Sequence, residues 1–357
     1  MSDRLEPAAL RAHDPQGMED LVRSWPAQIK DQRAALARSP WPRLAQSQPP
    51  RIIAVGALGG SATAAELVRG LVEDTLPAPF LIVREYAWPA ALGQGSLCVL
   101  SSYSGNTEET LALYDDAARR GAARAVISSG GEIRRRAQAD GVPYVSLPSG
   151  LPPRAALGYS LVSLLELLPS LGFGGLGEEA LSEAEQVLAA GDRRLAPESP
   201  EAENPAKRLA LALHGRVVVI YTAARFLAGA GLRWKGQVNE NAKTPAFSNA
   251  LPELNHNESV GWEALRSLHD RFGVVCLRDP EEHPRAAAQM EWTRGMLAEE
   301  GIVVTEARSS GTSRLARLLS LVQLGDWVSL YLAALAGVDP YPIVKIDALK
   351  RTLETTR

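Results

Sequence analysis

The chain has 357 residues, with 38 Lys and Arg against 41 Asp and Glu and a formal net charge of −3. That length is typical of about two domains, and the near-neutral charge disfavours a nucleic-acid-binding protein. With only Cys98 and Cys276, a disulfide framework and a multi-cysteine metal site are excluded. The polar first residues lack a secretory apolar core, and no apolar run predicts a membrane span, so we expect a soluble, cytoplasmic protein without nucleic-acid or membrane partners.

The first fifty residues predict helix and connector. Apolar residues recur at helical spacing through residues 18–39, and Pro26 marks a break or a new first turn. A proline-rich connector follows up to residue 50. The charge of this segment is nearly balanced, which argues against a basic head that reads DNA.

From residue 51, short apolar runs alternate with longer amphipathic stretches. Continuous apolar runs separated by helices are typical of a parallel sheet covered on both faces. The pattern predicts strands within 51–60, 79–86, 96–105, 122–131 and 142–150, and helices over 61–75, 106–121 and 132–141. We therefore expect an N-terminal helical segment over 1–50 and a first α/β domain over 51–150.

The same alternation restarts later in the chain. Helices over 158–172 and 178–195 lead to PESPEAENPA, which we expect to be a linker. Beyond it the pattern predicts strands at 215–224, 272–279 and 301–309, and helices over 226–243, 312–338 and 345–354. The predicted architecture is two similar α/β halves, with bridging helices and linker over 151–204, a second domain over 205–340 and a C-terminal helix over 341–357.

A glycine-rich turn follows the first predicted strand. Gly59, Gly60 and Ser61 precede a helix, whose free amides and dipole favour an anion. The turn is neither a Walker A loop nor G-x-G-x-x-G, although Glu85 roughly fits the ribose-binding acid of a dinucleotide fold. A tight strand-to-helix turn explains these residues equally well.

The loop after the third strand of the first half carries a sharper signal. The sequence SSYSGNT supplies several hydroxyls, among them Ser102, Ser104 and Thr107, together with a glycine at the start of a helix. Such a loop can bind a phosphate without a lysine. Helix capping by Thr107 or Asn106 would account for only one of these hydroxyls. We therefore predict a site for a sugar phosphate.

A third cluster lies in the second half. Glu240 stands among amides near the end of a predicted helix, and the polar stretch PELNHNE with His256 follows. A carboxylate and a histidine suit a general base and a second acid or base, although a lone histidine is more often structural. No second histidine lies three to five residues from His256, so we expect no metal.

Six segments resemble, in order along the chain, the bifunctional phosphoglucose/phosphomannose isomerase family, a branch of the sugar isomerase (SIS) domain superfamily: GALGGS, SSYSGNTEET, LPPRAALG, NENAKTPAF, PELNHNE and IDALKR. SYSGNT alone is similar to any SIS domain that binds a sugar phosphate, whereas NEN together with PELNHNE is more specific. The resemblance implies an α/β fold of two SIS-type domains, each a mainly parallel sheet flanked by helices in an αβα sandwich.

The resemblance also implies a reaction: glucose 6-phosphate or mannose 6-phosphate becomes fructose 6-phosphate through a cis-enediol, without a cofactor. It implies four catalytic roles: proton transfer between C1 and C2 by Glu240, ring opening by His256, stabilisation of the enediolate by Arg154 and a contact near the ring oxygen by Lys350. The phosphate-binding positions are matched by Gly59, Gly60, Ser61, Ser102, Ser104 and Thr107. Arg154 could instead anchor a loop, and Lys350 could be an ordinary surface lysine.

The superfamily resemblance further implies a homodimer in which the histidine reaches the neighbouring subunit's site. The chain departs from the family at residues 63–65, Thr-Ala-Ala, where relatives often have glycines, and at Tyr341, where they often have threonine. A bulky ring near the substrate leaves the relative use of the two aldose epimers open.

Two other functions compete with the isomerase. A non-catalytic SIS module that senses a sugar phosphate is disfavoured by the joint presence of Glu240, His256 and Arg154. The hypothesis of an NAD-dependent enzyme is based on the first glycine turn and Glu85. The spacing of the glycines does not match the dinucleotide-binding motif and argues against it.

Overall fold

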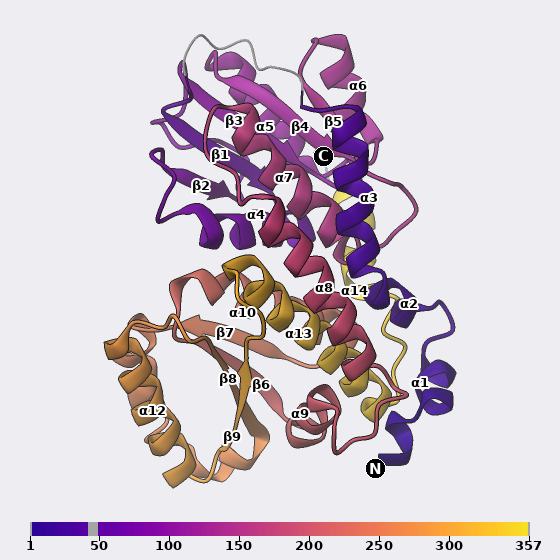
Figure 1. Ribbon diagram of the computed structural model, residues 1–357, viewed down its shortest axis with the longest axis vertical. Helices are drawn as coiled ribbons and strands as arrows, with labels where there is room; N and C mark the ends of the chain where they lie inside the picture. The colour runs from indigo at the N-terminus through magenta and orange to yellow at the C-terminus, as the bar shows by residue number, and fades with distance from the viewer. Residues whose placement is uncertain (1, 42–48, 356–357) are drawn as a thin grey trace.

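The computed structural model describes residues 2–41 and 49–355 (Figure 1). The predicted connector before residue 50 and the ends of the predicted terminal segments therefore lie partly outside the described residues. In Figure 1 two sheets occupy opposite ends of the molecule, with helices between them. This arrangement confirms the predicted fold class of two parallel sheets, each flanked by helices.

The first sheet has five parallel strands in the order β2-β1-β3-β4-β5. They form where continuous apolar runs were predicted: β1 (Ile52–Ala57), β2 (Phe80–Val83), β3 (Ser96–Ser101), β4 (Ala123–Ser128) and β5 (Tyr144–Ser146). Its inner face packs against α4 (Gly59–Val72), and its outer face against α5 (Glu108–Arg119) and α6 (Gly131–Ala139). Every residue of β3 is buried, as expected of a central strand covered on both faces.

The second sheet repeats this order with one strand fewer, β7-β6-β8-β9, and is also parallel. Its strands are β6 (Val217–Thr222), β7 (Ala246–Ala250), β8 (Phe272–Arg278) and β9 (Val303–Arg308). The inner face carries α9 (Pro205–Leu213), α10 (Ala228–Asn241) and α13 (Arg314–Ala336), and the outer face carries α12 (Pro284–Glu299). The predicted similarity of the two halves is therefore present in the strand order.

The helices between the sheets share one core cluster with both inner faces. Ile53 of β1, Leu161 and Val218 of β6 all belong to this cluster. The remaining helices are α1 (Pro7–His13), α2 (Met18–Arg23), α3 (Trp25–Arg38), α7 (Leu157–Ser170), α8 (Glu178–Leu195), α11 (Glu258–Gly261) and α14 (Val344–Thr355). Short 3₁₀ segments are η1 (Ser2–Leu5), η2 (Pro153–Ala155), η3 (Arg225–Leu227), η4 (Glu253–His256) and η5 (Arg266–Arg271). Because the core is continuous, the predicted domain boundaries remain a proposal.

Most of the predicted linker connects α8 to α9, and it is held tightly by hydrogen bonds. Asn204 within it is fully buried, and its side chain accepts bonds from the backbone amides of Ala206 and Lys207 and donates to the carbonyls of Leu195 and Ala196. Asn204 thus caps α9, a helix that the sequence pattern did not reveal. The strand β7 and the helix α12 were also missed, and α4 begins at Gly59 rather than at Ser61.

The helix α13 is long and apolar enough to cross a membrane, which differs from the expectation that no run reaches that length. Within the described residues, 94% of its most apolar window is buried in the protein. Asp326 near its middle is fully buried and pairs with Arg233. These contacts are those of a core helix.

Candidate active site

The two predicted phosphate loops leave the first sheet side by side. Ala57 at the end of β1 is in register with Ser101 at the end of β3. The chain continues from β1 to β2 on one side, whereas β3 lies on the other side. Open parallel sheets bind ligands at the carboxyl ends of the strands at such a switch point. The topology therefore brings the predicted phosphate-binding residues to the expected edge.

In the loop after β3, two of the predicted hydroxyl groups lie close together. The Oγ of Ser102 lies 2.8 Å from the Oγ1 of Thr107 and accepts a bond of 3.1 Å from the Gly105 amide. Ser104 is exposed, and its Oγ accepts from the Asn106 amide. Thr107 occupies the N-cap position of α5 without making a side-chain cap bond. The first amides of α5 are therefore left for an anion.

Glycine is required at the centre of this loop. Gly105 has a φ of 73°, and a Cβ there would lie 1.8 Å from the carbonyl oxygen of Gly130. Any side chain would push the loop after β3 away from the next loop of the sheet.

A cavity of about 330 Å³ lies where the start of α4, η2 and α10 meet. Four predicted residues line it: Gly59, Gly60, Arg154 and Glu240. Its other lining residues are Ala62, Thr63, Arg84, Leu232, Arg233, Lys235, Gly236 and Gln237. Gly60 allows the close approach, since a Cβ there would lie 2.9 Å from the carbonyl oxygen of Pro153. Ser61 is buried in the first turn of α4, between the lining residues Gly60 and Ala62.

A carboxylate and a cation face each other in this cavity. The Oε2 of Glu240 lies 3.7 Å from the Nη1 of Arg154, and 29% of the Glu240 side chain is exposed. Arg154 is 3% exposed, and it donates to the Oδ1 of Asn241 at 2.9 Å and to the carbonyls of Pro340 and Tyr341 at 2.8 and 2.6 Å. Burial lowers the pKa of Arg154, and Glu240 opposes that shift. Because arginine stays protonated in proteins, this group is a fixed positive charge beside the carboxylate.

Lys243 completes the anchoring of the C-terminal segment and was not predicted. It has a φ of 55°, and its Nζ donates to the carbonyls of Glu240, Pro340 and Pro342. Burial lowers its pKa, as does the charge of Arg154. Arg154 and Lys243 together hold the segment around Tyr341 against the end of α10. Arg154 therefore anchors a loop, as the alternative interpretation predicted, and it also lines the cavity.

The structure does not bring His256 or Lys350 to this cavity within one chain. His256 is exposed at the end of η4, which follows β7. Lys350 lies on α14 with 63% of its side chain exposed, and its Nζ is 3.9 Å from the Oδ1 of Asp347. Their catalytic roles therefore remain predictions.

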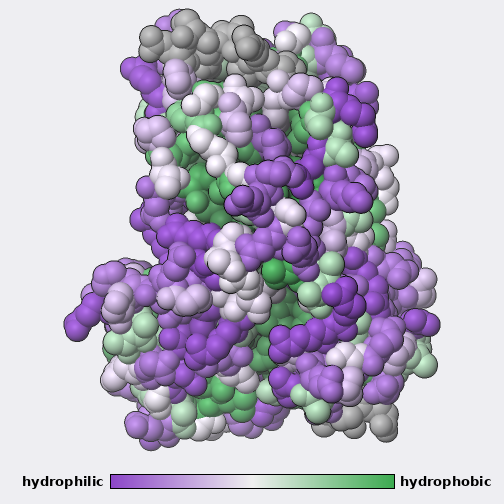
Figure 2. Space-filling model, in the orientation of Figure 1, coloured by the Kyte–Doolittle hydropathy of each residue, from purple (hydrophilic) through white to green (hydrophobic). Residues whose placement is uncertain are grey.

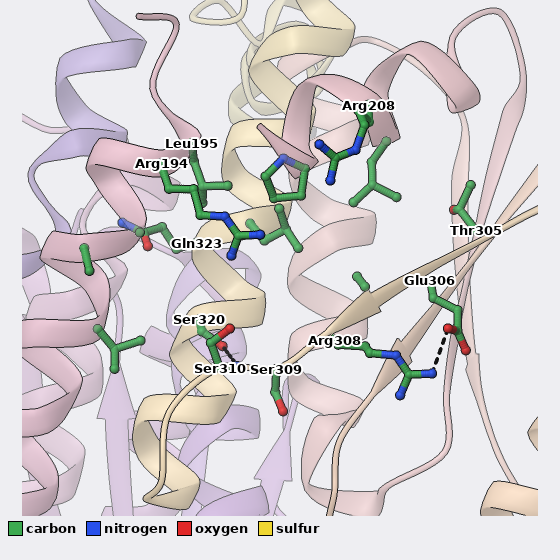
Figure 3. Close-up of a pocket in the computed structure, with 17 residues that line it drawn as sticks. Arg194, Leu195, Arg208, Thr305, Glu306, Arg308, Ser309, Ser310, Ser320 and Gln323 are labelled. Carbon is green, nitrogen blue, oxygen red and sulfur yellow. Dashed lines mark hydrogen bonds and ion pairs between the residues drawn. The ribbon is translucent and has the colours of Figure 1, made fainter. Parts of the chain in front are cut away.

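A larger cavity of about 710 Å³ lies elsewhere, between α8, α9, β9 and α13 (Figure 3). Figure 2, drawn in the orientation of Figure 1, shows apolar side chains at the floor of a hollow in the lower half of the molecule. None of the predicted residues lines this cavity. Its carboxylate, Glu306, already accepts bonds from Arg278, Arg294 and Arg308. With no free base, this cavity is a poor candidate for proton transfer.

Among the described residues, no group of three His, Cys, Asp or Glu side chains is placed to hold a metal ion. The smaller cavity instead combines a carboxylate, a buried arginine and the glycine turn after β1, and the predicted phosphate loop leaves the sheet at the neighbouring strand, β3. That combination can bind an anionic substrate, remove a proton from carbon and stabilise the resulting oxyanion.

Comparison with known proteins agrees with this chemistry. A family model described as bacterial phospho-glucose isomerase C-terminal SIS domain matches residues 202–353. A bifunctional phosphoglucose/phosphomannose isomerase from Caldicellulosiruptor bescii is 44% identical over 303 residues, covering 84% of this chain and 89% of the relative. The protein of the same name from Aquifex aeolicus is 35% identical, covering 77% and 82%.

Solved structures show the same fold. A glucose-6-phosphate isomerase like protein from Thermus thermophilus superposes with a TM-score of 0.62 at 23% identity, covering 94% of this chain and 96% of that one. Tagatose-6-phosphate ketose/aldose isomerase from Escherichia coli gives a TM-score of 0.61 at 17% identity, covering 89% and 92%. At these identities the likeness bears on the fold alone.

Proposed function

The chain belongs to the bifunctional phosphoglucose/phosphomannose isomerase family, and on that premise we propose how its residues perform the family's reaction. The protein is an aldose–ketose isomerase that interconverts glucose 6-phosphate or mannose 6-phosphate with fructose 6-phosphate. The hypothesis of a non-catalytic sensor is set aside because relatives of this chain are named as isomerases. The observation that carries the catalytic proposal is the pairing of Glu240 with the buried Arg154 in one cavity.

The phosphate group is proposed to bind at the loop after β3, with the turn after β1 beside it. The hydroxyls of Ser102, Ser104 and Thr107 and the open amides at the start of α5 donate to its oxygens. Neutral donors hold the phosphate reversibly, which suits a substrate that must leave after each turnover. Gly59, Gly60 and Ser61 are proposed to line the neighbouring edge.

The proton transfer is assigned to Glu240. Its carboxylate removes the proton from C2 of the open-chain aldose, and the electron pair of that C–H bond forms the C1–C2 double bond of a cis-enediolate. The proton of the C2 hydroxyl then passes to O1, so that the negative charge moves to O2. The same carboxyl group returns a proton to C1, the C1–C2 double bond becomes a single bond, and the carbonyl forms at C2. Arg154 stabilises the negative oxygen, because a buried guanidinium cannot release its own proton.

The proposed function is tested by incubating the purified protein with glucose 6-phosphate and, separately, with mannose 6-phosphate. Both reactions are run with a metal chelator, and fructose 6-phosphate is measured. Formation from both sugars is the expected result. Binding of both sugars without turnover would reinstate the sensor. Turnover of glucose 6-phosphate alone would mean that Tyr341, anchored beside Arg154, narrows the space around C2.

We further propose a homodimer in which His256 acts in the partner's site, and a cytoplasmic location. His256 is exposed and separate from the cavity in its own chain. The helix α14, which carries Lys350, exposes four large apolar side chains that a second copy could cover: Val344, Ile346, Leu349 and Leu353. Both features support a site that is completed by a neighbouring subunit.

Mixing two inactive variants tests the shared site. The His256→Ala and Glu240→Gln proteins are unfolded together, refolded and assayed. Recovery of about a quarter of wild-type activity is expected, because half of the dimers are mixed and one of the two sites in each is complete. Separate refolding of each variant is the control. Mixed dimers without any recovered activity would rule out the shared site.

A further inference from the structure

One buried side chain in the cavity has no role in the scheme above. Arg233, Gln237 and Asn241 follow one another at successive turns of the same face of α10, and they are 3%, 2% and 0% exposed. Arg233 makes two bonds to the carboxylate of Asp326, at 2.8 and 2.7 Å. Asn241 accepts from Arg154 and donates to the Oγ of Ser329, each at 2.9 Å. The residues one turn before and one turn after Gln237 are therefore both hydrogen-bonded to other side chains of the protein.

Gln237 itself makes no side-chain hydrogen bond to any residue in 2–41 or 49–355. Neither amide atom of Gln237 is sealed from solvent, so water in the cavity can bond both atoms until a ligand with a donor and an acceptor replaces it. Gln237 lines the 330 Å³ cavity together with Glu240, three residues further along the helix. Residues at this spacing are neighbours on a helix surface. The amide thus faces the space in which the proposed base works.

We propose that Gln237 is a substrate-binding residue whose amide hydrogen-bonds an oxygen of the open-chain hexose phosphate, close to the carbons between which Glu240 moves a proton. This inference rests on the proposed function and adds to it a residue that specifies the sugar part of the substrate. It explains why a polar side chain without a protein partner is buried in the cavity.

The chemistry of the amide suits this position. During isomerisation each of the two reacting oxygens changes between a carbonyl, which only accepts hydrogen bonds, and a hydroxyl, which donates and accepts. A glutamine side chain offers both a donor and an acceptor, so it can bind either form without taking up or releasing a proton. Binding of the aldose, the intermediate and the ketose by the same group changes affinity more than the rate of the chemical step.

The test is the Gln237→Leu variant, assayed with fructose 6-phosphate. We expect KM to rise by about 10- to 100-fold, as for the loss of a buried hydrogen bond, with kcat changed much less. Competitive inhibition by inorganic phosphate should be unchanged, because phosphate binds at the loop after β3. The thermal midpoint without substrate should be unchanged or higher, because the amide bonds no described residue and is open to the cavity in the free protein.

Gln32→Leu is the matched control. Gln32 is also 2% exposed, but its amide donates to the Oγ of Ser163 at 3.0 Å. This substitution should lower the thermal midpoint and leave KM unchanged. The nearly isosteric Gln237→Met variant provides a second version of the test if the leucine variant folds poorly.

The outcomes separate the two proposals. An inactive wild-type protein would contradict the proposed function itself. An active wild type with an unchanged KM in the Gln237 variants would overturn the inference and leave the isomerase intact. A lower thermal midpoint in both Gln237 variants would also overturn it, because the amide would then have a structural role in the free protein.

Discussion

Glu240→Gln is expected to lower kcat for the isomerisation of glucose 6-phosphate by about 10²- to 10⁴-fold, the range over which a positioned general base contributes. An amide has the shape of the carboxylate but cannot take a proton from carbon. Glu240 is only half-buried, and its closest charged partner, Arg154, keeps its three other acceptors in the variant. The fold and the phosphate loop should therefore persist.

The measurement is steady-state kinetics together with the rise in thermal midpoint on adding fructose 6-phosphate. Glu73→Gln is the control, because Glu73 is the C-cap residue of α4 and its carboxylate pairs with Arg225 outside the cavity. The control should keep wild-type kinetics, and the Glu240 variant should keep the thermal shift. Normal turnover by the Glu240→Gln protein would mean that another group is the base.

Arg154→Met is expected to lower kcat by about 10²- to 10³-fold, the usual cost of removing one donor from an oxyanion site. The methionine fills much of the same volume without supplying charge to the enediolate. The variant also leaves the carbonyls of Pro340 and Tyr341 without this donor, at a cost of about 1–3 kcal/mol in the free energy of unfolding. Kinetics and denaturant unfolding measure the two effects separately.

Lys243→Met separates catalysis from anchoring. Lys243 donates to the carbonyls of Pro340 and Pro342, so its removal releases the same C-terminal segment while Arg154 stays beside Glu240. We expect a similar loss of stability and a much smaller loss of kcat. If both variants lose kcat equally, Arg154 acts by holding the segment and not by stabilising the enediolate.

The sequence predicted the elements whose pattern is set by burial on both faces. β1, β3, β6 and β8 are continuous apolar runs, and each forms near its predicted position. β7 was missed because it is an edge strand that is mostly half-buried, so its sequence, AFSNA, does not look like a core strand. α9 was missed because its capping residue, Asn204, lies in a proline-rich stretch typical of a linker.

The candidate site was predictable only in part. The loop that holds Ser102 and Thr107 has local signals, namely hydroxyls and a glycine between a strand and a helix. The pairing of Arg154 with Glu240 depends on how the helices pack, and no local pattern reports it. Gln237 and Lys243 each lie three residues from Glu240 in the sequence. The proposed role of Gln237 in substrate binding and the anchoring role of Lys243 depend on which hydrogen-bond partners they have or lack in the folded chain.

Isomerisation of fructose 6-phosphate in deuterium oxide tests whether a carboxylate moves the proton through an enediol. Nuclear magnetic resonance then measures deuterium at C2 of the glucose 6-phosphate formed. We expect deuterium in a substantial fraction of the product, because a proton on the Glu240 carboxyl group exchanges with solvent before it returns to carbon. Product formed with no deuterium at C2 would indicate direct hydride transfer between C1 and C2, and Glu240 would then not be the base.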